Sequence, residues 1–134
     1  MKTTKKNLFL LLPITLWSIA GSAYALDCEN ITASAQIDVC AKAEKESADK
    51  KINESYKKLI TRIKEQYAPD PEMAERYLSK LKSSQRAWIA LRDTNCEFES
   101  FLADPSYPAH ETLTNNCITK MSQERSAYLD RTQP

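Results

Sequence analysis

The chain has 134 residues, 28% of them charged and 42% hydrophobic, with a formal net charge of +1 at pH 7. This balance disfavours nucleic-acid binding, which requires an excess of Lys and Arg to contact phosphates. There is no G-x-S-x-G motif, no phosphate-binding loop and no recognisable glycosidase-like pair of carboxylates. We therefore predict that the protein is not an enzyme. The single histidine, His110, has no cluster of carboxylates or thiolates around it in sequence, and we expect no metal and no cofactor.

Residues 1–25 have the pattern of a secretory signal peptide. A cationic start, MKTTKKN, precedes the apolar run LFLLLPITLWSIAGSA, and Ala23-Tyr24-Ala25 fits the small-x-small cleavage signature. Pro13 interrupts the run, which is short for a bilayer span of about 20 residues, so we expect no stable membrane anchor after cleavage. The prediction is a single domain over residues 26–134, periplasmic or secreted, with a net charge of −2 once three lysines have been removed.

The mature part has a helical pattern. The chain's one glycine, Gly21, lies in the predicted signal peptide, so the mature part has none. Tight hairpin turns rely on positive φ, which glycine adopts most readily, so β-strands are disfavoured. Apolar side chains recur at helical spacing over residues 34–67, over 71–101 and over a shorter stretch after Pro108. Asp70, followed by a proline, is a good N-cap for the second stretch. We therefore predict an all-α fold, a small antiparallel bundle of two long helices and one shorter helix.

A polar stripe interrupts the second helix. Gln85, Trp88 and Arg92 share one face at spacings of three and four residues. Short connections make consecutive helices antiparallel neighbours, so the two long helices are expected back to back. That register places Asn53 opposite Gln85 and Asp49 near Arg92. We predict a buried structural network of these five side chains, with a ligand-binding polar cleft as the alternative.

The four cysteines favour two disulfides, because an even number in an exported protein is typical of structural bridges. There is no C-x-x-C motif to support redox catalysis. The antiparallel fold brings Cys40, Cys96 and Cys117 to one end of the bundle, with Cys28 within reach. We predict the pairs Cys28–Cys40 and Cys96–Cys117, which would brace that end. The pairs Cys40–Cys96 and Cys28–Cys117 remain possible on sequence grounds.

An ordered set of residues along the helices carries a family resemblance. The set consists of Cys40-Ala41, Asp49, Asn53, Tyr56, Gln85-Arg86-x-Trp88, Arg92-Asp93-x-x-Cys96 and Arg125-x-x-x-Leu129. It resembles the LprI-like lysozyme inhibitor N-terminal domain, and the resemblance runs from Cys28 to about Leu129. It implies a small helical module of an exported bacterial protein that inhibits lysozyme in the periplasm or outside the cell.

Charge is distributed unevenly along the chain. Residues 26–41 and 93–119 contain eight acidic residues and no Lys or Arg, and we call these two segments the acidic pole. Its acidic members are Asp27, Glu29, Asp38, Asp93, Glu97, Glu99, Asp104 and Glu111. The intervening residues 42–92 carry +5. Glu97 and Glu99 lie near the negative end of a helix dipole, against their local preference, which favours a role in binding a basic partner.

The partner implied is lysozyme or a related wall-degrading hydrolase, whose groove holds two carboxylates. An inhibitor would fill that groove with a protruding loop, and the loop around Tyr107 and His110 is the candidate; His110 also has a simpler interpretation as a loop or cap residue. The predicted contact residues are Glu97, Glu99, Asp104, Tyr107, His110 and Glu111. The alternative function is a periplasmic immunity or envelope-interaction module, which binds another toxin or cell-wall enzyme.

Overall fold

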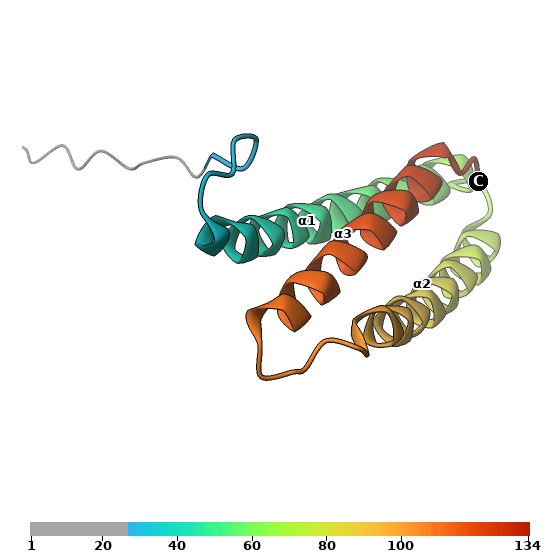
Figure 1. The fold of residues 1–134 in the computed structure, drawn as a ribbon. Helices are drawn as coiled ribbons and strands as arrows, with labels where there is room; N and C mark the ends of the chain where they lie inside the picture. The colour runs from blue at the N-terminus through green and yellow to red at the C-terminus, as the bar shows by residue number, and fades with distance from the viewer. Residues whose placement is uncertain (1–26) are drawn as a thin grey trace, which may run out of the picture.

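Three helices make up the part of the chain that the structure describes. The computed structural model describes residues 27–134, so the predicted signal peptide lies outside the described residues. Helix α1 spans Ser34–Gln66, α2 spans Pro71–Ser100 and α3 spans Pro108–Arg131, and residues 27–134 contain no strand (Figure 1). The all-α prediction is confirmed, and the bounds of the two long helices agree with the predicted ones to within one residue.

Helix α1 begins with a cap made by a glutamine. The N-cap residue is Ala33, which has no side-chain acceptor for the free N–H groups of the first turn. The side-chain oxygen Oε1 of Gln36 instead accepts hydrogen bonds from the backbone N–H groups of Ala33, at 2.9 Å, and Thr32, at 2.8 Å. This is half of a capping box, in which the third helical residue reaches back to the start of the helix.

Helix α2 begins as its sequence predicts. The Asp70 carboxylate accepts a hydrogen bond from the backbone N–H of Met73 at 3.0 Å, and Pro71 occupies the first helical position. Proline at that position loses no hydrogen bond, because the N–H it lacks would have no partner inside the helix. Glu72 adds a negative charge near the positive end of the helix dipole. The turn between α1 and α2 is therefore fixed by local chemistry.

The apolar core lies among all three helices. Its buried members are Ile52, Leu59, Ile63, Leu81 and Leu129, and the partly buried side chains packed against them are Tyr56, Ile60, Tyr67, Tyr77, Leu78 and Trp88. The C-terminal end of α3 is held beside α1, because one Arg62 guanidinium nitrogen donates to the carbonyl oxygens of Leu129, at 2.7 Å, and Thr132, at 3.3 Å. A cation at this end of a helix also opposes the negative end of its dipole.

Helix α3 is the main neighbour of α1, which corrects the prediction that the two long helices lie back to back along their length. Close backbone contacts are most numerous between α1 and α3 and fewest between α1 and α2. In Figure 1, α1 and α2 diverge from their turn, and α3 runs beside α1. Ser55 of α1 and Ser122 and Ser126 of α3 are fully buried, and such small side chains let two helices approach closely.

Two disulfides staple the bundle. Cys28 is bonded to Cys40, and Cys96 to Cys117, each with a Cα–Cα distance of 5.5 Å. The predicted pairing is confirmed, and the alternative pairing is excluded. The first bridge straps the segment before α1 onto that helix. The second ties the last turns of α2 to α3.

Candidate functional site

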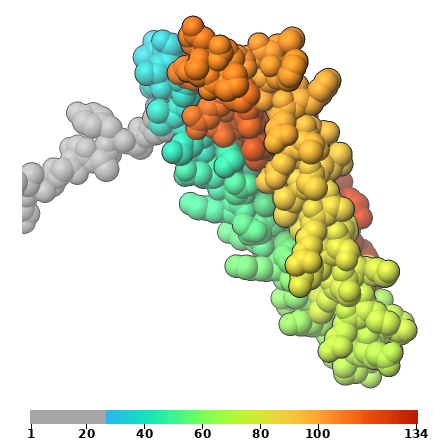
Figure 2. Space-filling model, turned by 90° about the horizontal axis from the view of Figure 1, so that it is seen from below, coloured from blue at the N-terminus to red at the C-terminus, as the bar shows by residue number. Residues whose placement is uncertain are grey.

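The segments of the acidic pole meet at one end of the molecule. The segment before α1, the start of α1, the end of α2 and the start of α3 lie together there, and the turn between α1 and α2 lies at the opposite end (Figure 2). Because α3 separates α1 from α2, it is α3 that holds this end together. The Cys96–Cys117 bridge ties α3 to α2, and the Thr112 hydroxyl of α3 donates a hydrogen bond to the Asp38 carboxylate of α1.

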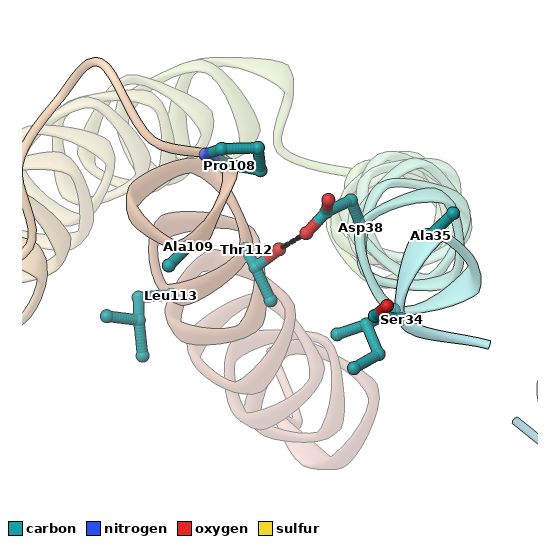
Figure 3. A pocket seen from close by; sticks show the side chains of 8 residues that line it. Ser34, Ala35, Asp38, Pro108, Ala109, Thr112 and Leu113 are labelled. Carbon is teal, nitrogen blue, oxygen red and sulfur yellow. Dashed lines mark hydrogen bonds between the residues drawn. The ribbon is translucent and has the colours of Figure 1, made fainter. Parts of the chain in front are cut away.

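A shallow groove opens between the first turns of α1 and α3 (Figure 3). Its volume is about 560 Å³, and the hydrogen bond between Thr112 and Asp38 crosses it. Ile37 and Leu113 line it and remain 45% and 47% exposed. Ile37 therefore does not belong to the buried face of α1. The groove is too open to enclose a small ligand.

Most carboxylates of the acidic pole have no basic partner within the described residues. Asp93 is the exception, because the Arg92 guanidinium lies 2.8 Å from its carboxylate. Glu97 and Glu99 are exposed on the last turn of α2. Unpaired carboxylates on adjacent elements add their fields, and they attract basic molecules with a strength that salt reduces.

The connection between α2 and α3 is held by local hydrogen bonds. The Asp104 carboxylate accepts from the Ser106 backbone N–H at 2.8 Å and from its hydroxyl at 2.7 Å. These hydrogen bonds from Ser106 lower the pKa of Asp104 below its ordinary value, because they stabilise the charged form. His110 Nδ1 lies 3.1 Å from the Ala103 carbonyl oxygen, and since that oxygen can only accept, Nδ1 donates. His110 is half-buried and braces the connection, whereas Tyr107 is 64% exposed.

Part of the predicted polar network is present. Arg92 of α2 lies 3.4 Å from the Asp49 carboxylate of α1, as expected from the register. Its guanidinium carbon is also 5.3 Å from the centre of the Trp88 ring, and one nitrogen is 3.5 Å from the Ser122 hydroxyl of α3. Arg92 therefore contacts α1 and α3 as well as its own helix.

The predicted pairing of Asn53 with Gln85 is wrong. Asn53 is exposed on α1 and makes no side-chain hydrogen bond within residues 27–134. The Gln85 side-chain oxygen instead accepts from Nε of Arg125 in α3, at 3.1 Å. The physical reason is the position of α3, which provides the partner that the sequence analysis assigned to α1.

Arg125 is a network residue that the sequence analysis did not assign to the network. One of its terminal nitrogens donates to the Ser84 hydroxyl at 2.9 Å, and its guanidinium carbon lies 5.8 Å from the Trp88 ring and 4.9 Å from the Tyr128 ring. Burial lowers its pKa, although arginine remains charged in proteins. Its position four residues before Leu129, on the helical spacing of the buried stripe, is the signal that could have found it.

Three apolar side chains near the acidic pole were also missed. Phe98, Phe101 and Leu102 are 81%, 78% and 95% exposed. The signal for Phe98 is its place in the helix, since it follows Cys96 by two positions and therefore lies about 200° around the helix from that buried side chain.

Residues 27–134 show neither a metal-binding cluster nor a membrane-spanning helix. No set of three or more His, Cys, Asp or Glu side chains is placed to hold a metal ion, and none of the three helices is both long and apolar enough to span a membrane.

Three helices stapled at one end by two disulfides, with an arginine–tryptophan network between them, define a small disulfide-bonded helical module. The chain belongs to the family described as lysozyme inhibitor LprI, whose pattern matches residues 28–129. The crystal structure of a DUF1311 family protein from Pseudomonas putida is similar, with a TM-score of 0.66 and 28% identity, and the match covers 75% of this chain and 94% of that one. An uncharacterized protein from Rhizobium meliloti is 28% identical over 109 residues, which are 77% of this chain and 76% of the relative.

Proposed function

We propose that this protein inhibits lysozyme, with a c-type lysozyme as the simplest target, by laying its acidic pole across the active-site groove. Membership of a lysozyme inhibitor family supports the class of activity. The observation that carries the binding mode is the gathering of carboxylates without basic partners, among the described residues, at an end of the bundle braced by disulfides.

Charge supports the choice of partner. Animal lysozymes are strongly basic, so an acidic surface accelerates encounter and favours this orientation over others. The acidic pole carries eight acids and no Lys or Arg, whereas residues 42–92 carry +5. The opposite surface would therefore be repelled by the same partner.

Side chains that fill the groove lie beside the two catalytic carboxylates of lysozyme, and hydrogen-bond donors are favoured there. The Tyr107 hydroxyl is exposed and can donate a hydrogen bond to one of them. His110 is the second candidate contact, and it is Nε2 that remains available because Nδ1 is engaged by the Ala103 carbonyl oxygen. Glu97, Glu99, Asp104 and Glu111 would instead contact basic residues around the rim of the groove.

Inhibition of lysozyme places the proposed site of action outside the cytoplasm. In this account, residues 1–25 act as a signal peptide and are removed on export. The mature domain of residues 26–134 then acts in the periplasm or outside the bacterial cell, where it protects the envelope through a protein–protein interaction. Mass spectrometry of the exported protein would establish the cleavage site.

A turbidity assay tests the proposal. Bacterial cells are lysed by an animal c-type lysozyme, with increasing amounts of the exported protein, at two salt concentrations. We expect lysis to stop as the inhibitor exceeds the enzyme, and inhibition to be weaker at high salt because the exposed charges are screened. Uninhibited lysis at a several-fold molar excess would contradict the proposal. Recovery of a different toxin or wall enzyme in a pull-down, with lysozyme unaffected, would favour an immunity or envelope-interaction module.

A further inference from the structure

Phe98, Phe101 and Leu102 form the most exposed apolar group among the described residues. We call these three side chains the apolar tip. A soluble domain of this size gains stability by burying Phe and Leu, and contiguous exposed apolar groups on such domains commonly mark binding sites.

The three side chains of the apolar tip lie on one stripe. Phe98 precedes Phe101 by three residues and Leu102 by four, which are the spacings of neighbours on a helix face. The helical backbone continues just past the end of α2, since the N–H of Phe101 bonds to the carbonyl of Phe98 at 3.3 Å and that of Ala103 to Ser100 at 3.0 Å. The opposite face of this turn is buried, with Cys96 and Ser100 each 1% exposed.

The backbone beneath the apolar tip is held in place. Cys96 is bonded to Cys117 of α3, and the Ser100 hydroxyl donates to the Cys96 carbonyl oxygen at 2.9 Å. His110 bonds to Ala103 directly after the tip. A surface that is already ordered before binding loses less conformational entropy when it docks.

Charge around the apolar tip selects its occupant. Glu97 and Glu99 flank Phe98 in the chain, and Asp104 follows Leu102 by two residues. A second copy of this chain docked tip to tip would bring these carboxylates together, and an anionic lipid surface would repel them. A basic protein with an apolar recess satisfies both the apolar side chains and the acids around them.

We propose that the apolar tip is the energetic anchor of the complex and inserts into an apolar recess, rimmed by basic residues, in the groove of the inhibited lysozyme. This inference rests on the proposed function and names the part of the acidic pole that supplies most of the affinity. In interfaces of this kind a few central aromatic and aliphatic anchors dominate, and the charged rim contributes mainly to rate and orientation. Tyr107 and His110 keep their proposed contacts with the catalytic carboxylates and contribute less of the affinity than the tip.

The test compares two variants of the exported protein. One replaces the tip, Phe98→Ser/Phe101→Ser/Leu102→Ser. The matched control, Ile89→Ser/Leu91→Ser, replaces two apolar side chains that are 40% and 53% exposed on the same helix. Leu91 lies about 10 Å along the helix axis from Phe98, at 1.5 Å per residue. Circular dichroism and thermal melting report the fold, and titration into a c-type lysozyme reports the inhibition constant and Kd.

The tip variant is expected to keep the wild-type melting behaviour and to raise the inhibition constant at least tenfold, since truncating an interface anchor typically weakens binding by about that factor or more. The control should stay within about twofold of wild type. If the wild type inhibits and the tip variant inhibits equally well, this inference is wrong and the proposed function stands. If the wild type does not inhibit, the proposed function itself fails.

Two further measurements test the alternative binding partners of the apolar tip, a second copy of this chain and a lipid surface. Analytical ultracentrifugation of the wild type should give a monomer, and a dimer that the tip variant abolishes would overturn the inference in favour of self-association. Flotation with vesicles of neutral phosphatidylcholine should leave the protein unbound. Binding to these vesicles that depends on the tip would overturn it in favour of a membrane surface.

Discussion

Arg125 of α3 reaches across to Trp88 of α2, with its guanidinium carbon 5.8 Å from the centre of the indole ring. Arg92 lies 5.3 Å from the same ring, so one tryptophan is contacted by guanidinium groups from two helices. Cation–π contacts of this kind contribute about 0.5–2 kcal/mol each. The network joins α2 to the pair formed by α1 and α3, and it thereby positions the end of α2 that carries Glu97 and the apolar tip.

Replacing Trp88 should weaken the whole bundle. Trp88→Ala removes a half-buried ring together with both cation–π contacts, and we expect the free energy of unfolding to fall by about 3 kcal/mol. Urea denaturation followed by circular dichroism measures the loss. Trp88→Phe, which retains a smaller ring, should lose about half as much. A loss below about 1 kcal/mol for the alanine variant would show that the ring does not join the helices.

Arg125 should not be replaceable by lysine. Arg125→Lys keeps the charge but cannot bond Gln85 and Ser84 together while stacking on aromatic rings, so we expect a loss of about 1–2 kcal/mol in the free energy of unfolding. Arg86→Lys, on the exposed surface of α2, is the matched control and should change stability by less than about 0.5 kcal/mol. Equal effects of the two substitutions would contradict this role for Arg125.

The two disulfides should have similar effects on stability and different effects on binding. From the lengths of the loops they close, removing either bridge should cost about 3 kcal/mol. Cys96→Ala/Cys117→Ala frees the end of α2 from α3, so it should also weaken lysozyme inhibition by about tenfold. Cys28→Ala/Cys40→Ala leaves that connection intact. The inhibition constants of both variants are measured under conditions in which both are folded. Equal inhibition by the two variants would contradict a special role of the Cys96–Cys117 bridge in binding.

Neutralising the end of α2 should slow association. Glu97→Gln/Glu99→Gln removes two charges from the acidic pole, and we expect the association rate with a c-type lysozyme to fall about threefold to tenfold at low salt. The effect should largely disappear at about 0.5 M salt. Surface plasmon resonance at several salt concentrations measures the association rate and its dependence on salt.

The matched control for this charge prediction is Glu72→Gln/Glu75→Gln at the other end of the same helix. Glu75 lies about 33 Å along the helix axis from Glu97, well beyond the range of charge interactions in physiological salt. This variant should associate within about twofold of the wild-type rate. If the two pairs of substitutions slow association equally, net charge and not the acidic pole governs encounter.

The helices and disulfides could be predicted because local signals determine them. Asp70 and Pro71 begin α2 where the sequence indicates, and Pro69 lies in the turn of residues 67–69 that follows the end of α1. The antiparallel fold predicts that the cysteines gather at one end, but it leaves two pairings open, and the structure has Cys28–Cys40 with Cys96–Cys117. These features depend on short stretches of chain or on the length of a helix, which is why periodicity was sufficient.

The packing of α3 against α1 could not be predicted from apolar periodicity, because the buried face of α3 is largely polar. Its buried polar side chains are Thr112, Asn115, Thr119, Ser122 and Ser126. Two of these hydroxyls show how polar side chains can be buried here, because Ser126 donates to the Ser122 carbonyl of its own helix at 2.8 Å and Thr112 donates to the Asp38 carboxylate of α1. For this reason the sequence pairs Gln85 with Asn53 of α1 and not with Arg125 of α3, its partner in the structure. The apolar tip could not be predicted from the buried stripe of α2, because Phe98, Phe101 and Leu102 lie on the opposite, exposed face.

The most direct test of the binding surface is hydrogen–deuterium exchange of the exported protein with and without an excess of a c-type lysozyme. We predict that the complex slows exchange over residues 93–113, with the strongest effect around Phe98 and Leu102, and leaves residues 65–80 at the other end of the bundle unchanged. Protection confined to residues 65–80, or to the face of α1 remote from the disulfides, would contradict the account.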